Sequence, residues 1–284
     1  MIEFELIFDG GRADEGLLEF YDASHALVGF QRSLALTTHL VLHGEIITQA
    51  PFAQGFEIYI PAVQQGSWKS KAIVALSAAS MVLSAGKDSP LGQIVTSVYD
   101  AALYNVMGFH VDYDETLQEQ YASYLRKKSI THEKIDSLCE KIETSVAEMH
   151  RPIVRSESAT RAQVARCGPL RRDIGPVLSP LTYEYVKQTK KEEGESVLLG
   201  YVSSYNINTF KGRIFSLEEK RPIPFELEDS AKTRKQVAVL TGSQHINGQD
   251  RNSRDALVAL HGQRLISQSG RTKRFVAYLV EQGI

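Results

Sequence analysis

Cysteine is scarce in this chain, and its first residues do not resemble a leader segment. Only Cys139 and Cys167 are present, so at most one disulfide could form, which argues against a disulfide-stabilised secreted scaffold. Met1 is followed at once by the alternating segment 2–8, where a signal peptide would place a charged and then an apolar stretch. Both observations predict a chain that begins in the cytoplasm.

Catalytic motifs are equally scarce. The Gly86-Lys87 pair lacks the upstream glycine and the preceding strand of a phosphate-binding loop, and Ser203 lacks the following glycine of a nucleophile elbow. His39 and His43 lie four residues apart on a predicted helix, a spacing that can hold zinc, but a third ligand is not evident. We therefore predict a protein that is not an enzyme and carries no cofactor.

One enzymatic alternative stays open. The turn at Gly66-Ser67 and the pair Asp112 and Asp114 are residue types that nucleotidyltransferases use to hold phosphates and metal ions. The helical segment predicted between them makes the separation too long for that motif. A hydrolase or transferase using Asp112, Asp114 or His39 is the third hypothesis, after the two non-enzymatic ones given below.

Composition and charge point to an anionic partner for the second half. With 43% apolar and 23% charged residues over 284 positions, the chain resembles a soluble globular protein of one large or two modest domains. Residues 1–155 contain 12 Lys and Arg against 20 Asp and Glu, whereas residues 156–284 contain 20 against 14. A basic second half favours an anionic ligand, or else attraction between the halves or between subunits.

Hydrophobic periodicity predicts an α+β protein in four parts. A strand at 2–8, a long helix within 17–47 and a strand at 55–60 form a small α+β unit, residues 1–70. Residues 71–155 are predicted to be helical, and residues 156–180, rich in Pro, Gly and Arg, to be a linker. Short runs over 181–284 predict a small antiparallel β-barrel. The predicted barrel strands are 196–205, 209–217, 222–227, 236–240, 256–267 and 273–281.

A hairpin of two small-residue helices is predicted at residues 71–109. The helix at 72–86 is short for a membrane span, whereas the helix at 91–109 has a suitable length but carries Asp100. Small residues four apart, such as Ala75 and Ala79, let helices approach closely in a membrane or in a soluble bundle. If the hairpin forms a multi-subunit pore, we expect Asp100 and Asn105 to line it. The alternative is a buried hairpin in a soluble bundle.

The predicted barrel carries the residue types of a strand-binding surface. Single-stranded nucleic acids are bound by cations that contact phosphates and by aromatic rings on which bases stack. The segment 205–213 supplies both types, and a basic cluster precedes and enters the last strand. The candidate ligand-binding residues are Tyr205, Asn208, Lys211, Arg213, Arg271, Lys273 and Arg274.

The order of these parts resembles the channel-forming effector of Hailong-type bacterial antiphage defence systems. The resemblance lies in the first strand and long helix, the segment 55–60 with Gly66-Ser67, the small-residue hairpin and the C-terminal barrel. It implies a homo-oligomeric channel in the bacterial inner membrane with cytoplasmic domains. It also implies regulation by a single-stranded DNA that a partner nucleotidyltransferase makes.

Two non-enzymatic hypotheses follow. The first is a membrane-associated, channel-like defence effector regulated by an anionic nucleotide or single-stranded oligonucleotide. The second is a soluble, cytoplasmic, oligomeric protein that binds nucleic acid or regulates another protein, with the hairpin serving in oligomerisation.

Overall fold

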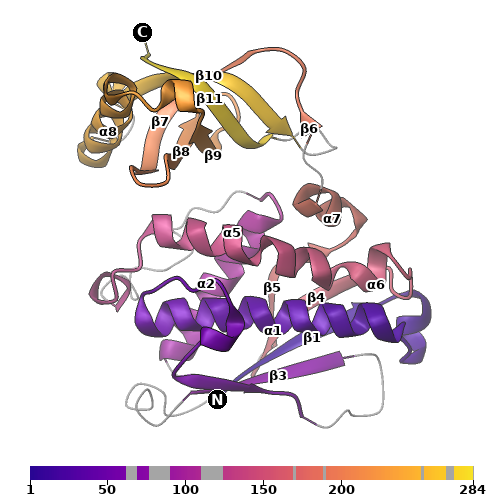
Figure 1. The fold of residues 1–284 in the computed structure, drawn as a ribbon. Helices are drawn as coiled ribbons and strands as arrows, with labels where there is room; N and C mark the ends of the chain where they lie inside the picture. Colours follow the sequence, from indigo (N-terminus) through magenta and orange to yellow (C-terminus); the bar gives the residue numbers. More distant parts are fainter. Residues whose placement is uncertain are drawn as a thin grey trace. The chain divides into compact units, whose positions relative to one another are not determined.

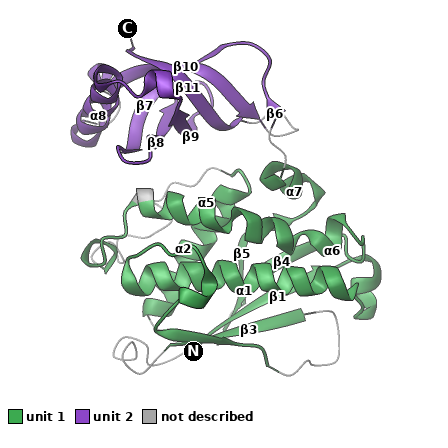
Figure 2. Ribbon diagram, viewed as in Figure 1, with its two compact units in different colours: residues 1–187 green, residues 188–284 purple. Residues whose placement is uncertain are grey.

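The chain forms two compact units, Met1–Lys187 and Gln188–Ile284 (Figure 2). The computed structural model describes residues 1–61, 69–76, 90–109, 124–168, 171–187, 190–250, 253–266 and 272–283. Each unit has its own hydrophobic core. The three N-terminal parts predicted from the sequence therefore belong to one unit, and the boundary falls after Lys187, close to the predicted position at residue 180.

The first unit is built on an antiparallel sheet of five strands in the order β2-β3-β1-β4-β5. Along the central strand, Phe4, Leu6 and Phe8 are fully buried, as expected for every second residue of a strand with one face on a core. The strands are β1 (Ile2–Asp9), β2 (Phe56–Tyr59), β3 (Lys69–Leu76), β4 (Arg161–Cys167) and β5 (Arg172–Leu178).

Helices α1, α2 and α5 pack together over this sheet (Figure 1). At Gly29 of α1 an added Cβ atom would lie 2.4 Å from the carbonyl oxygen of Ser145 in α5, so only glycine permits this close approach. The Phe4 ring meets Tyr99 of α2 edge to face. The helices are α1 (Phe20–His43), α2 (Pro90–Val106), α5 (His132–Met149), α6 (Arg151–Val154) and α7 (Pro180–Lys187).

The second unit is a closed barrel of five strands in the cyclic order β7-β8-β9-β11-β10. All pairings are antiparallel except β9 with β11. A three-strand meander, then helix α8 (Arg234–Gln249), then a hairpin give the strand order of the oligonucleotide-binding (OB) fold. The strands are β7 (Ser196–Asn206), β8 (Lys211–Ser216), β9 (Arg221–Leu227), β10 (Leu257–Ile266) and β11 (Thr272–Gln282), with β6 (Lys190–Lys191) added to β10.

Helix α8 forms hydrogen bonds with the backbone of β7 at a point where the pairing of that strand is irregular. The pairing of β7 with β8 shifts register between Val202 and Ser204. Ser243 of α8 accepts a hydrogen bond from the Val202 N–H at 3.1 Å and donates one to the Ala256 carbonyl at 2.5 Å. Asn247 donates to the Val202 carbonyl at 3.2 Å. The helix thus supplies the partners that the backbone of this buried bulge requires.

The α+β class is confirmed, while the barrel is mixed because β9 and β11 run parallel. Three predicted segments are wrong. Residues 71–76, predicted helical, belong to β3, and the predicted linker 156–180 contains β4 and β5 of the core sheet. The predicted strand 236–240 lies inside α8. The rest of the first hairpin helix, residues 77–86, lies outside the described residues.

Candidate nucleic-acid interface

The outer surface of β8, β9 and β11 gathers cations beside one aromatic ring. On β8, Ile214 points into the core, so the alternation of a strand places Lys211, Arg213 and Phe215 on the outside. Their partners on β9 are Glu226, Pro224 and Pro222 respectively. Cross-strand partners share a face of the sheet, so these residues form one continuous surface.

Glu226 lies between two of the cations. Its Oε2 atom is 3.4 Å from Nη1 of Arg274 on β11 and 4.0 Å from Nζ of Lys211 on β8. We call Lys211, Arg213, Phe215, Glu226 and Arg274 the β8–β9–β11 face. The side chains of Lys211, Glu226 and Arg274 are 41%, 31% and 31% exposed, whereas Arg213 is only 8% exposed. The accessible charge is therefore concentrated at Lys211 and Arg274.

The face has the chemistry of a surface for single-stranded nucleic acid. Cations contact phosphates, and the half-buried Phe215 ring offers a flat surface on which a base can stack. β8 and β9 are the second and third strands of the barrel, and barrels of this topology bind oligonucleotides and oligosaccharides on that part of their surface. A fold does not by itself establish a function, so the inference depends on the residues of the face.

Of the seven predicted ligand-binding residues, the structure brings together Lys211, Arg213 and Arg274. The prediction for Tyr205 is wrong. Its ring stacks on the Phe225 ring inside the barrel, with 6.0 Å between the ring centroids, and the residue is only 6% exposed. This burial raises the pKa of its hydroxyl. Asn208 lies in the exposed turn after β7, where its N–H donates to Asn206 Oδ1 at 2.9 Å.

The last two predicted residues belong to the end of the barrel. Lys273 is a partly exposed residue of β11 beside Arg274, and Arg271 lies outside the described residues. Sequence reasoning missed Phe215 and Glu226. Period-two alternation along 211–216 and 221–227 would have placed both on the same side as Lys211.

The predicted pore-lining residues lie on α2 of the first unit. Asp100 Oδ1 accepts a hydrogen bond from the Gly175 N–H at 2.6 Å, and Oδ2 pairs with Arg172 Nη2 at 2.9 Å. The Asp100 side chain is 9% exposed, so its charge is compensated within its own unit, and this arrangement argues against a pore-lining role. Asn105 is half-buried near the end of α2. Over the described residues, no helix combines the length and apolarity of a membrane span.

Two histidines in the last turns of α1, His39 and His43, contact the loop at Gln54. His39 Nδ1 accepts from the Gln54 N–H at 3.2 Å, and His43 Nε2 lies 3.0 Å from the Gln54 carbonyl oxygen. Burial, and then the charge of His43, lower the pKa of His39. In the parts of the chain that the structure describes, no cluster of three or more His, Cys, Asp or Glu residues is arranged to hold a metal ion. Asp112 and Asp114 are outside those parts.

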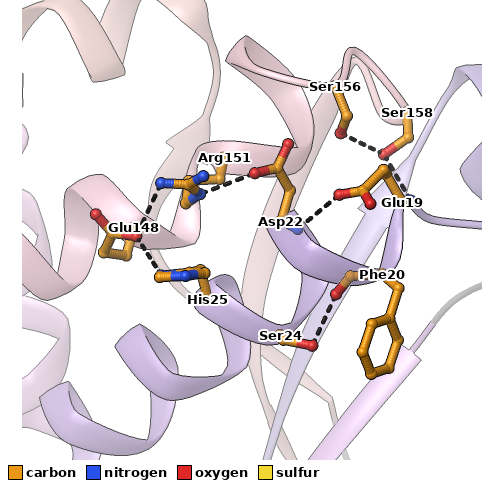
Figure 3. Close-up of polar contacts among 9 residues, drawn as sticks. All are labelled: Glu19, Phe20, Asp22, Ser24, His25, Glu148, Arg151, Ser156 and Ser158. Atoms are coloured by element: carbon orange, nitrogen blue, oxygen red, sulfur yellow. Dashed lines mark hydrogen bonds and ion pairs between the residues drawn. The ribbon is translucent and has the colours of Figure 1, made fainter.

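A second polar cluster joins α1 to the junction of α5 and α6 (Figure 3). Arg151 Nε donates to Asp22 Oδ1 at 2.8 Å, and Arg151 Nη1 lies 3.5 Å from Glu148 Oε2. His25 Nδ1 is 3.0 Å from the same Glu148 oxygen. Each charge in this cluster therefore faces an opposite or titratable partner, and the cluster ties helices together within the first unit.

Family comparisons divide the chain as the structure does. One matching family model, a domain of unknown function (DUF7946), covers residues 4–171, and a second, a family of unknown function (DUF7947), covers residues 195–280. The first match lies within the first unit and the second within the barrel unit. No curated protein and no solved structure matches the chain. The chain therefore belongs to the DUF7946 family, whose model spans more than half of it, and its barrel region matches the DUF7947 model.

Proposed function

We propose that the chain is a non-enzymatic regulatory protein whose barrel binds an anionic single-stranded oligonucleotide. The observation that carries this proposal is the β8–β9–β11 face, where Lys211 and the Phe215 ring lie on β8 and Arg274 lies on β11, the two strands that flank β9. The resemblance to the antiphage effector implies a channel, a membrane location and a single-stranded DNA ligand. The β8–β9–β11 face supports the last of these, a nucleic-acid ligand. The basic balance of residues 156–284 is consistent with such a ligand.

The binding geometry follows from the barrel. An oligonucleotide that runs along β8 would set one phosphate near Lys211 and Arg274 and, about 13 Å further along the β-strand, a base over Phe215. Such contacts recognise the backbone and the flat surface of a base, so we expect binding with little sequence preference. In a duplex the bases are already stacked on one another, so the Phe215 contact favours a single strand.

The test is a fluorescence anisotropy titration of the full chain with a labelled oligothymidylate of about ten nucleotides. Such a strand has no secondary structure, and its site size is within the range of about 4–16 nucleotides for OB folds. We expect the affinity to fall with salt, with a slope of log K of about −0.7 for each phosphate contact. Lys211→Ala with Arg274→Ala should weaken binding about tenfold or more and reduce that slope by about 1.4.

The matched control is Arg234→Ala with Lys235→Ala. This pair removes the same charge from exposed residues in the first turn of α8, neither of which belongs to the face. If both double variants weaken binding equally, the β8–β9–β11 face is not the site. If the unmodified chain and the Glu226→Gln variant both fail to bind the strand at low salt, the proposed function is wrong.

A further inference from the structure

The structure assigns to Glu226 the role of an internal competitor for the phosphate site. This inference rests on the proposed function, because it concerns how the same face is regulated. Glu226 Oε2 lies within 4.0 Å of a side-chain nitrogen of both Arg274 and Lys211. A phosphate oxygen bound by both cations would take the same position.

The strand register explains why the carboxylate is there. Glu226 is directly opposite Lys211 in the β8–β9 pairing, and on its other side β9 runs parallel to β11, which carries Arg274. All three side chains are partly exposed, so water and ligand can reach the cluster. A partly exposed ion pair is weak enough to be exchanged, unlike a buried one.

Competition has a consequence for ligand choice. A single phosphate must displace Glu226, or bind beside a negative charge, and gains only two cations for doing so. A longer strand makes the same exchange once and adds further phosphate contacts and base stacking elsewhere on the barrel. Glu226 therefore lowers the affinity for every phosphate ligand, so that a strand, with its further contacts, still binds while a mononucleotide or inorganic phosphate binds only weakly, and binding of strands stays reversible.

The expected size of the effect follows from Coulomb's law. A unit charge about 4 Å from the ligand contributes about 1 kcal/mol of repulsion at the dielectric constant of water, which corresponds to about fivefold in affinity. Glu226→Gln should thus bind the ten-nucleotide oligothymidylate about fivefold more tightly at low salt. The gain should be of similar size, as a ratio, for thymidine monophosphate, because this ligand makes the same single exchange.

The experiment compares the full chain, Glu226→Gln and the control Glu281→Gln with both ligands. The control makes the same charge change elsewhere on β11. Glu281 lies five residues beyond Val276, which is the partner of Glu226 on β11, and it pairs with His261 at 3.2 Å. The inference is supported if Glu226→Gln binds more tightly and Glu281→Gln does not. A gain in affinity cannot arise from misfolding, so it separates competition from a merely structural role.

Each other outcome counts against one specific claim. If the unmodified chain binds and Glu226→Gln binds equally or more weakly, the competitor role is wrong and the barrel proposal stands. If both glutamate variants gain equally, the effect is one of net charge and the competitor role is again wrong. If neither the chain nor Glu226→Gln binds either ligand, the proposed function fails and the inference fails with it.

Discussion

Two carboxylates, one in each unit, show how burial changes what an ion pair does. Asp100 and Glu226 each pair with an arginine of a β-strand, Arg172 of β5 and Arg274 of β11. The Asp100 side chain is 9% exposed and also accepts a backbone N–H bond, whereas the Glu226 side chain is 31% exposed and lies between two partly exposed cations. Arg172 is itself 55% exposed, so the difference lies in the buried carboxylate and the backbone N–H that depends on it, because a buried donor without an acceptor is costly while an exposed ion pair contributes little. The first unit uses its carboxylate to hold structure, and the barrel has one that, under the proposed function, a ligand would replace.

The largest expected effect in this comparison is that of Asp100→Ala. The change leaves the Gly175 N–H buried without its acceptor, while the half-exposed Arg172 can be hydrated, so we expect the free energy of unfolding of the first unit to fall by about 2–3 kcal/mol. Urea unfolding followed by hydrogen exchange of peptides from α2 and β5 measures this. Asp173→Ala is the control, since Asp173 is 63% exposed in its pair with Arg171. If Asp100→Ala and Asp173→Ala had equal free energies of unfolding, Asp100 would contribute no more to stability than an exposed carboxylate.

Acid should weaken the first unit through His150. This residue donates from Nδ1 to the Val146 carbonyl at 2.7 Å and accepts from the Thr182 hydroxyl at Nε2 at 2.9 Å, and burial lowers its pKa from 6.5 to about 4. Between these values only the unfolded chain binds the proton, so stability is complete above pH 6.5 and is lost as the pH falls towards 4. We expect a loss of about 2 kcal/mol between pH 6.5 and about pH 5.

Urea unfolding by circular dichroism at several pH values, with His150→Gln for comparison, measures this contribution. The variant should be less stable at neutral pH but should lack the part of the acid dependence that belongs to the histidine. Parallel pH profiles for the two proteins would show that the buried histidine does not titrate as its contacts imply.

The smallest effect is expected for Glu226→Ala. The ion pairs that it removes are partly exposed, so the free energy of unfolding of the barrel should change by less than about 0.5 kcal/mol. Hydrogen exchange of peptides from β9 and β11 measures this. A loss above about 2 kcal/mol would mean that Glu226 holds the barrel together, and the comparison with Asp100 would no longer separate the units.

Local sequence patterns predicted the elements that local signals define. β1 alternates, α1 ends at Gly44 in the left-handed conformation that favours glycine, and α5 begins after Thr131, whose side chain accepts from the Lys134 N–H. The signal of α8 was present but missed. Thr233, with Gln236 three residues later, has the spacing of a capping box, and Thr233 accepts from the Gln236 N–H.

Elements whose structure depends on partners distant in the sequence could not be predicted from local patterns. Residues 69–76 have no charge after Lys71 and many small side chains, which suit a helix as well as a strand. They form β3 because β1 and β2 bind the backbone on both sides. The residues of the candidate site likewise fall into those that a local pattern predicts and those that only the three-dimensional fold brings together. Lys211 and Arg213 follow from alternation along one strand, whereas the approach of Arg274 to Glu226 depends on the parallel pairing that closes the barrel.

The order of strands in the first sheet also limits how copies of the chain can associate. β2 and β5 are its outermost strands. β2 has only four residues, including the exposed Glu57, and β5 contains Gly175 and Pro176, features that discourage an incoming strand from adding to an edge. The barrel closes upon itself, which protects its long strands from such addition. Fibril-like growth through backbone pairing is thus opposed at the strand edges that the structure describes, which favours side-chain surfaces for any association of copies.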